Sequence, residues 1–290
     1  MIHEIPLERH TLHGHFSRDL PPILTIDSGD SLRFSTLDAG WHAVPENQHF
    51  DDLDPELDGG HALVGPIEVR GAAAGGTLEI RIDAVRVGTW GITFGDGEGM
   101  LWSLDAAAGT GSGPANATVA LAPFLGVLGM PPPESGSHST APPRRWGGNI
   151  DCKELVAGTT LFLPIPVDGA LFSAGDGHAR QGDGEVSGTA IECPLELAEL
   201  TLELRDDLTL ETPIARTPGT WIAFGFDEDL DRAAATATDA MLELMGRELG
   251  VRKAEALALA SVVVDLRVTQ VVNGVKGVHA VLADDSIRMD

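Results

Sequence analysis

The chain has 290 residues, 43% of them hydrophobic, and its 44 acidic and 19 basic residues give a formal net charge of −25. A surface this acidic repels the phosphates of nucleic acids and anionic lipids. Neither is therefore expected as a partner. No apolar run reaches the roughly 18 residues needed to span a bilayer, and the N-terminus lacks a basic segment followed by an apolar one. Two cysteines are too few for a disulfide framework, and the sequence predicts a cytoplasmic protein.

The first clear element is a strand over residues 78–87. Leu78, Ile80 and Ile82 alternate with charged residues, which is the period of a half-buried strand. Glycines and prolines recur about every ten residues along the chain, as in sandwiches and barrels. These patterns favour β-structure.

The composition changes between residues 105 and 148, where two stretches rich in Gly, Pro and Ser flank the apolar segment "LAPFLGVLG". The second stretch, "MPPPESGSHSTAPPRRWGG", reads as a linker. The sequence therefore predicts an N-terminal β domain over residues 1–140. A C-terminal β-rich domain over residues 141–290 would carry the segment "GDGHARQGDGE" and helices near 229–261.

A second alternating pattern, at Leu200, Leu202 and Leu204, predicts another strand. Asp206 and Asp207 follow it, and they suggest a hairpin turn into residues 208–210.

One late block has helical periodicity. Acidic residues crowd its start near Asp229, where the helix dipole favours anions, and Gly250 suits its end. A second helix, from Lys253 to about residue 261, runs into the apolar strand "VVVDLRVTQVV". The expected fold is mainly β with a small α component (α+β), in which β-sandwich or barrel-like domains are followed by a helical block.

The segment "FSAGDGHARQGDGEVSGTAIE", residues 172–192, combines glycines with a histidine and several acids. On an extended strand Asp176 and His178 point to the same side, with Gly175 and Gly177 leaving room around them. The following turn can bring Glu185 alongside. Two carboxylates and an imidazole suit a divalent metal of the zinc type better than a pure calcium cage. A solvated hairpin loop is the alternative interpretation.

The stretch "GGNIDCKEL" supplies two further candidates. If it is a strand, Asp151 faces away from Ile150 and Cys152, so its carboxylate can reach a site while the thiol stays in the core. Cys152 is a candidate nucleophile, but a buried structural thiol is the interpretation that we favour.

Two histidines could extend into a cleft. His61 follows two glycines and precedes an apolar strand, and His42 lies in "GWHAVP". A surface or core role is the simpler reading of each one alone. The sequence has no Gly-x-Ser-x-Gly elbow, no phosphate loop and no dinucleotide fingerprint, which argues against those classes of enzyme.

Five blocks taken in order resemble the acetamidase/formamidase family: "HALVGPIEVRGAAAGGTLEIRI", "LAPFLGVLGMPPP", "RRWGGNIDCKEL", "LFLPIPVDGALFSAGDGHARQGDGEVSGTAIE" and "DLRVTQVVNGVKGVHAVL". The resemblance runs from about residue 60 to residue 283. The "GNIDC" and "GDGHARQGDGE" blocks are its specific parts.

The resemblance implies an amidohydrolase that acts on linear C–N bonds of short amides such as formamide and acetamide, giving ammonia and a carboxylate. It also implies a mainly β homo-oligomer, at least a dimer, with a bound divalent metal. The mixture of imidazole and carboxylates makes zinc the first choice and calcium the alternative. The family's polar blocks fall on Asp151, Asp176, His178 and Glu185 as metal ligands, with His61 at the start of the "VGPI" block.

Amide chemistry then suggests roles for these residues. A metal would polarise the carbonyl and activate water, and a carboxylate would pass a proton to the leaving nitrogen. We expect Glu185, His61 and Asp151 to be catalytic, with Glu185 as either ligand or base and His61 holding the oxyanion. Two alternatives remain: a metal-independent hydrolase that uses Cys152, and a non-enzymatic β-sandwich module with structural calcium.

Overall fold

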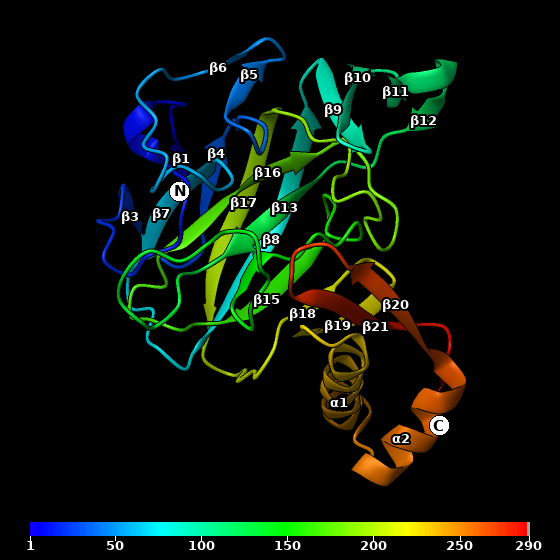
Figure 1. The fold of residues 1–290 in the computed structure, drawn as a ribbon. Coiled ribbons are helices and arrows are strands. Elements are labelled where there is room, and N and C mark those ends of the chain that lie inside the picture. Colours follow the sequence, from blue (N-terminus) through cyan, green and yellow to red (C-terminus); the bar gives the residue numbers. More distant parts are fainter. Residues whose placement is uncertain (289–290) are drawn as a thin grey trace.

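The computed structural model describes residues 1–288, and within them β-strands dominate (Figure 1). Nine strands in this part of the chain form the largest sheet. In spatial order they are β1 (Ile2–Glu4), β4 (Asp30–Phe34), β17 (Leu195–Arg205), β8 (Thr77–Val87), β15 (Thr160–Pro164), β18 (Ile214–Arg216), β19 (Thr220–Asp227), β21 (Lys276–Ala283) and β20 (Val264–Gln270).

A second sheet carries the residues of most interest. Its strand order is β14 (Gly147–Asn149), β13 (Phe124–Gly129), β16 (Phe172–His178), β7 (Leu63–Val69) and β2 (Leu12–His13), and β3 (Leu24–Ile26) pairs in parallel with β7. Every residue of β13 and β16 is buried, so these two strands form a rigid base.

Two smaller sheets lie beside this base at the upper edge of Figure 1. One contains β12 (Thr118–Ala120), β11 (Thr110–Ser112), β10 (Glu98–Asp105) and β9 (Trp90–Gly95), and the other contains β5 (His42–Val44) and β6 (Asn47–Gln48). Two short 3-10 helices, at Arg9–Thr11 and Pro114–Asn116, complete the first half.

The alternating patterns correctly predicted two long strands, β8 and β17, which pair with each other over most of their length. Leu78, Ile80 and Leu202 are fully buried in the main hydrophobic core. The hairpin predicted after Asp206 and Asp207 is wrong. Both edges of β17 are already occupied by β4 and β8, so the following chain leaves the strand, and the next strand, β18, pairs with β15 and β19 instead.

The helical block is also confirmed. α1 (Leu230–Leu249) and α2 (Lys253–Val263) lie below β19 and β21 in Figure 1, and a face of α1 that includes Ala237 and Met241 is buried in a second hydrophobic cluster. The Asp229 side chain accepts hydrogen bonds from the backbone N–H groups of Asp231 and Arg232, and Gly250 ends the helix with a left-handed φ of 68°. The expected fold class, mainly β with a small α component, is confirmed.

Strands from both sides of the predicted division near residue 140 share the sheets. β8 lies between β17 and β15, and β7 pairs with β16. The Pro-rich stretch that reads as a linker also contributes buried residues, among them Pro132 and Thr140. The division into residues 1–140 and 141–290 stays a prediction, whereas the contacts between the two segments are extensive.

Neither helix among residues 1–288 is both long and apolar enough to cross a membrane.

Candidate functional site

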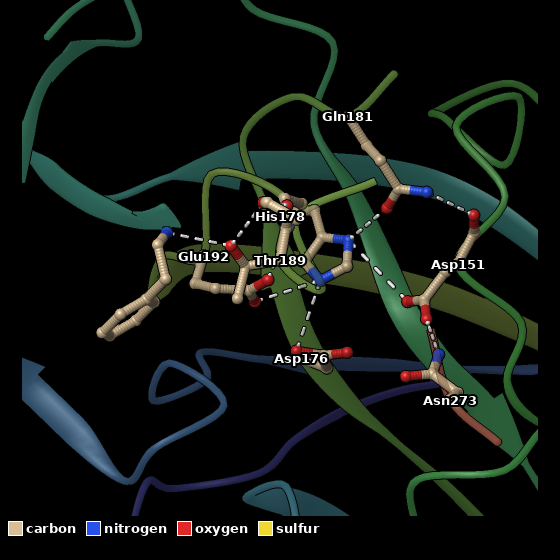
Figure 2. Close-up of polar contacts among 10 residues, drawn as sticks. Asp151, Asp176, His178, Gln181, Thr189, Glu192 and Asn273 are labelled. Carbon is tan, nitrogen blue, oxygen red and sulfur yellow. Dashed lines mark hydrogen bonds and ion pairs between the residues drawn. The ribbon is translucent and has the colours of Figure 1, made fainter. Parts of the chain in front are cut away.

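The site is built where β14 and β16 end and β13 begins. Asp151 follows β14 by two residues, and Asp176 and His178 lie in the last part of β16 (Figure 2). After a loop the chain returns along β16, so that Glu192 forms an antiparallel bridge with His178. This return places the Glu192 carboxylate beside the imidazole.

A loop from the C-terminal sheet closes another side of the site. Asn273, between β20 and β21, donates a hydrogen bond from Nδ2 to Oδ2 of Asp151 at 2.6 Å. Gly184 is attached to the end of β20, because its N–H donates to the carbonyl of Thr269 (3.1 Å) and its carbonyl accepts from Val271 (3.2 Å). This attachment fixes the backbone next to Glu185.

These side chains border a cavity of about 230 Å³. Its polar lining includes all four sequence-predicted ligands together with Glu192, Asn149, Asn273, His61, His42 and Asp38. The structure therefore brings together Asp151, Asp176, His178, Glu185 and His61, which the sequence had placed in one site.

The imidazole of His178 is the centre of the arrangement. Its Nε2 lies 3.1 Å from Oε2 of Glu192 and 3.4 Å from Oδ1 of Asp176, and its Nδ1 lies 3.9 Å from Oδ1 of Asp151. All four side chains are at least nine-tenths buried. Burial of three carboxylates around one imidazole is costly unless a cation or protons compensate the charge.

Gln181 determines which nitrogen of His178 carries a proton. The carbonyl of Asp151 can only accept, so Nε2 of Gln181 donates to it (2.7 Å) and Oε1 faces the imidazole. Oε1 then accepts from Nδ1–H of His178 at 3.1 Å. With Nδ1 protonated, neutral His178 directs the lone pair of Nε2 at Asp176 and Glu192.

Several buried oxygens around this imidazole make no hydrogen bond within the described chain. They are Oδ1 of Asn149, Oδ1 of Asp151, Oδ1 of Asp176, Oε2 of Glu185 and Oε2 of Glu192. Buried polar atoms nearly always have a hydrogen-bond partner. Here the only ion pair that Oδ1 of Asp176 and Oε2 of Glu192 each form within residues 1–288 is with His178, so the cluster fits a bound cation. The donors fall into two groups that share His178, one with Asp176 and Glu192 and one with Asp151 and Glu185, and within each group the donor atoms lie within 4.8 Å of one another. This mixture of imidazole and carboxylates fits a divalent metal of the zinc type.

The electrostatics reflect the same crowding. Burial raises the pKa of Asp151 well above its ordinary value, and Glu185 adds to the effect. Burial likewise raises the pKa of Glu185 to about 7 and that of Glu192 above its ordinary value. Burial alone would lower the pKa of His178, but Glu192 and Asp176 raise it well above its usual range. In the metal-free protein, protons therefore take up charge that a cation would otherwise balance.

The pKa of Asp176 moves in the opposite direction. Burial alone would raise this pKa, but the neighbouring charges of His178 and His61 hold it below the usual range. Asp176 is therefore the carboxylate of the cluster that stays ionised most readily.

Three of these acids adopt left-handed backbone conformations, with φ of 51° at Asp151, 61° at Asp176 and 44° at Glu185. Aspartate tolerates this region better than most residues, whereas glutamate is strained in it. Such strain concentrates at functional sites, where the surrounding structure holds it. Residues 150–152 are not a strand: β14 ends at Asn149, and Asp151 reaches the site from the chain that follows it.

Gly175 and Gly177 do not leave room around Asp176 and His178, as the sequence suggested. A Cβ at Gly175 or Gly177 would meet backbone carbonyls, of Ala62 and Cys193 respectively, at 2.4 Å, so these glycines allow close chain packing away from the site. Space inside the site comes from Gly126 on β13. A Cβ there would lie 2.4 Å from Oδ2 of Asp176, 2.7 Å from Oδ1 of Asp151 and 2.8 Å from Cε1 of His178.

The two histidines at the cavity wall are held by polar partners. Oγ1 of Thr140 lies 2.7 Å from Nδ1 of His61 and accepts the backbone N–H of His61 at 3.0 Å. His42 contacts the buried carboxylate of Asp38 through Nδ1 at 3.1 Å. Both imidazoles border the cavity, so neither is a simple surface or core histidine.

Cys152 lies in the main hydrophobic core and does not border the cavity. Its thiol donates to Oε2 of Glu154 at 3.2 Å, and burial raises its pKa well above the ordinary value. The expectation that Asp151 reaches the site while the thiol stays buried matches this placement. A thiol of this kind is a poor nucleophile.

Sequence reasoning missed four residues of the site: Glu192, Gln181, Asn273 and Gly126. Glu192 and Gln181 stand within the 172–192 segment that drew attention to the site. Asn273 and Gly126 carry no local signal, since only the fold brings a loop of the C-terminal sheet and a residue of β13 to the carboxylates.

The chain belongs to the acetamidase/formamidase family, whose model matches residues 3–111 and 132–283. It is similar to a formamidase of Methylophilus methylotrophus, with 25% identity over 244 residues that cover 61% of this chain and 60% of that protein. This chain thus spans less than two thirds of the length of that relative.

Solved structures agree with this assignment. A crystal structure of an acetamidase from Bacillus halodurans superposes with a TM-score of 0.86 at 28% identity, covering 96% of this chain and 97% of the other. A predicted acetamidase/formamidase from Thermoanaerobacter tengcongensis also gives 0.86, at 26% identity, with coverage of 98% and 97%.

Proposed function

We propose that this protein is a metal-dependent hydrolase that converts carboxylic amides to ammonia and a carboxylate. The observation that carries the proposal is the cluster of unpaired buried carboxylate oxygens around His178 at the floor of a cavity. The similarity to acetamidases and formamidases supports the choice of amides as substrate class.

Asp176, His178 and Glu192 are the residues that would hold the metal, because Nε2 of His178, which is unprotonated in the neutral tautomer, faces the two carboxylates. Glu192 is oriented for this by the backbone N–H of Ala190, which donates to its Oε1 at 2.8 Å. A divalent ion bound there would polarise the amide carbonyl and lower the pKa of a water molecule from about 15.7 towards 7.

Asp151 and Glu185 border the same cavity on the Nδ1 side of His178. Each of the two has one buried oxygen without a hydrogen bond, but Asp151 is held by Asn273 through its other oxygen. Burial raises the pKa of Glu185 to about 7, which suits the carboxylate that accepts a proton from water and passes it to the leaving nitrogen. Asp151 serves as a further ligand or as the partner that positions this water. Amines are poor leaving groups until protonated, so this transfer is as necessary as activation of the carbonyl.

His61 supplies a donor to the oxygen that develops negative charge. Oγ1 of Thr140 lies 2.7 Å from Nδ1 of His61, and in the neutral tautomer that accepts from this hydroxyl, Nε2–H can donate to an oxygen in the cavity. A donor positioned before the reaction lowers the barrier because it needs no reorganisation as the charge forms.

Ammonia release from formamide, acetamide and propionamide, measured together with elemental analysis of the purified protein, tests the proposal. The protein should contain close to one equivalent of a divalent metal, and chelation should abolish turnover until metal is restored. His178→Ala should lose both metal and activity, whereas His10→Ala, at an exposed position, should keep both. An active His178→Ala protein with its full metal content would remove the ligand role.

The rival route through Cys152 predicts that metal-free protein keeps full activity. The buried, high-pKa thiol does not favour it. A structural calcium module predicts stabilisation by calcium and no ammonia from any amide, and the imidazole at the centre of the donor set does not favour that alternative. Homodimer formation and a cytoplasmic location stay predictions, testable by light scattering and fractionation.

A further inference from the structure

Strand β9 presents a row of apolar side chains to the cavity. Trp90, Ile92 and Phe94 are alternate residues of this strand, so they share one face. All three border the cavity whose floor is Asp176 and Glu192. Within residues 1–288 they belong to none of the hydrophobic clusters, and Phe94 is 39% exposed. Trp90 and Ile92 are half-buried, so part of the apolar surface of this row is open to the cavity.

The row is held firmly next to the carboxylates. Ile92 and Glu192 exchange two backbone hydrogen bonds, from the Ile92 N–H (2.8 Å) and from the Glu192 N–H (2.9 Å). The indole of Trp90 donates to the carbonyl of Ala43 at 3.0 Å, and the N–H of Phe94 donates to Oγ1 of Thr189 at 3.0 Å. An apolar wall is thus fixed directly beside the polar floor.

The cavity is larger than the smallest amides require. Its volume of about 230 Å³ is more than ten times the roughly 15 Å³ that admits one water molecule. Pro45 extends the apolar wall. The β9 row and Pro45 form the apolar side of this cavity, and the carboxylates form its polar side. A pocket divided in this way can bind an organic group on one side and a reactive head group on the other.

We infer that the row Trp90, Ile92 and Phe94 is a subsite for the hydrocarbon part of the substrate, and that the preferred substrates are primary amides of medium-length aliphatic or aromatic carboxylic acids. This inference rests on the proposed function. The carboxamide group lies among the carboxylates, and the acyl chain covers the β9 row. Burial of this apolar surface supplies binding free energy that formamide and acetamide cannot.

A series of amides measured with the metal-loaded full-length protein tests the subsite. Ammonia release is followed for formamide, acetamide, propionamide, butyramide, hexanamide and benzamide. The inference predicts that kcat/KM rises about two- to fourfold with each methylene up to butyramide. A maximum at formamide with a fall for every added carbon overturns the subsite and leaves the amidase proposal intact. Absence of ammonia from every amide overturns both.

Variants of β9 locate the effect. Ile92→Ala and Phe94→Ala should each lower the ratio of kcat/KM for hexanamide to that for formamide by about five- to tenfold. Leu101→Ala is the matched control. Leu101, on β10, is the cross-strand partner of Ile92 and is 57% exposed, but it does not border this cavity. It should keep the wild-type ratio.

Thermal unfolding confirms that each variant is folded. Phe94 is exposed, so its replacement tests the subsite even if Ile92→Ala fails to fold. An unchanged ratio in folded Phe94→Ala contradicts the inference.

Discussion

Gln181 lies against His178 so that its side-chain oxygen accepts the proton on Nδ1, at 3.1 Å. The other end of the same carboxamide donates to the carbonyl of Asp151, and this contact fixes its orientation. One side chain therefore selects the tautomer of His178 and ties it to the turn that carries Asp151. The role of Gln181 is to position His178, which we propose as a metal ligand.

Replacement of Gln181 by leucine should weaken metal binding about 10- to 100-fold, because the imidazole loses both its orientation and its tautomer. Competition with a chromophoric chelator measures the affinity directly. Gln48→Leu, at an exposed position on β6, is the control and should bind metal like the wild type. Unaltered affinity in Gln181→Leu would mean that the hydrogen bond does not orient His178.

Gly126→Ala should abolish metal binding. The new methyl group would lie 2.4–2.8 Å from atoms of Asp176, Asp151 and His178, so at least one of these side chains must move. Overpacking of this kind also lowers the free energy of unfolding by about 1–3 kcal/mol. The matched control is Gly182→Ala, since nothing lies within 4 Å of a Cβ at that position. Metal content and thermal unfolding measure the two effects, and a metal-loaded Gly126→Ala protein would contradict the expectation.

The metal-free protein should lose stability as the pH rises. Burial raises the folded-state pKa of Glu185 from an unfolded value of about 4.5 to about 7. The stabilising contribution of its protonated form is therefore complete below pH 4.5 and is lost as the pH rises through 7, a change of about 3 kcal/mol. Unfolding in denaturant from pH 4.5 to 8 measures it, and Glu185→Gln should flatten the curve. Equal pH dependence in the two proteins would argue against a raised pKa.

Glu154 should stabilise the fold in the opposite sense. Burial alone would raise its pKa, but contacts with His279 and the thiol of Cys152 lower it to about 2. Its contribution is complete above the unfolded pKa of about 4.5 and is lost as the pH falls towards 2. Because this carboxylate is partly exposed and screened, the loss should be about 1–2 kcal/mol.

Acid unfolding of Glu154→Gln against the wild type checks this expectation. The variant should be less stable at pH 7 and should approach the wild type near pH 2. As a control, Glu203→Gln removes an exposed carboxylate that pairs with Arg81 on the surface, and it should change stability by less than about 1 kcal/mol. A constant difference between Glu154→Gln and the wild type at all pH values would show that packing, not charge, is responsible.

Local patterns were sufficient for the regular elements. Alternation of Leu78, Ile80 and Ile82 predicts β8, and the acids before Leu230 predict the start of α1, because both signals act within a few residues. The hairpin after Asp207 could not be excluded in this way. Its failure depends on β4 and β8, which already occupy both edges of β17 and come from distant parts of the chain.

Local patterns also predicted only part of the candidate site. The segment around His178 contains three of the predicted residues, Asp176, His178 and Glu185, because its chemistry is concentrated within a few positions. Glu192 becomes its neighbour only through the return of the chain along β16, and the backbone at Asp176 is left-handed where a regular strand was expected. No local sequence pattern indicates Gly126. This residue matters because a side chain there would collide with Asp176, Asp151 and His178.

Gly184 is attached to the end of β20, and Asn273 contacts Asp151. These contacts connect the cavity to both the six-stranded and the nine-stranded sheet. A displacement of the loop between β20 and β21 would consequently shift Asp151 and the backbone next to Glu185. The length of this loop is constrained in the same way, since a longer or shorter loop could not keep both contacts.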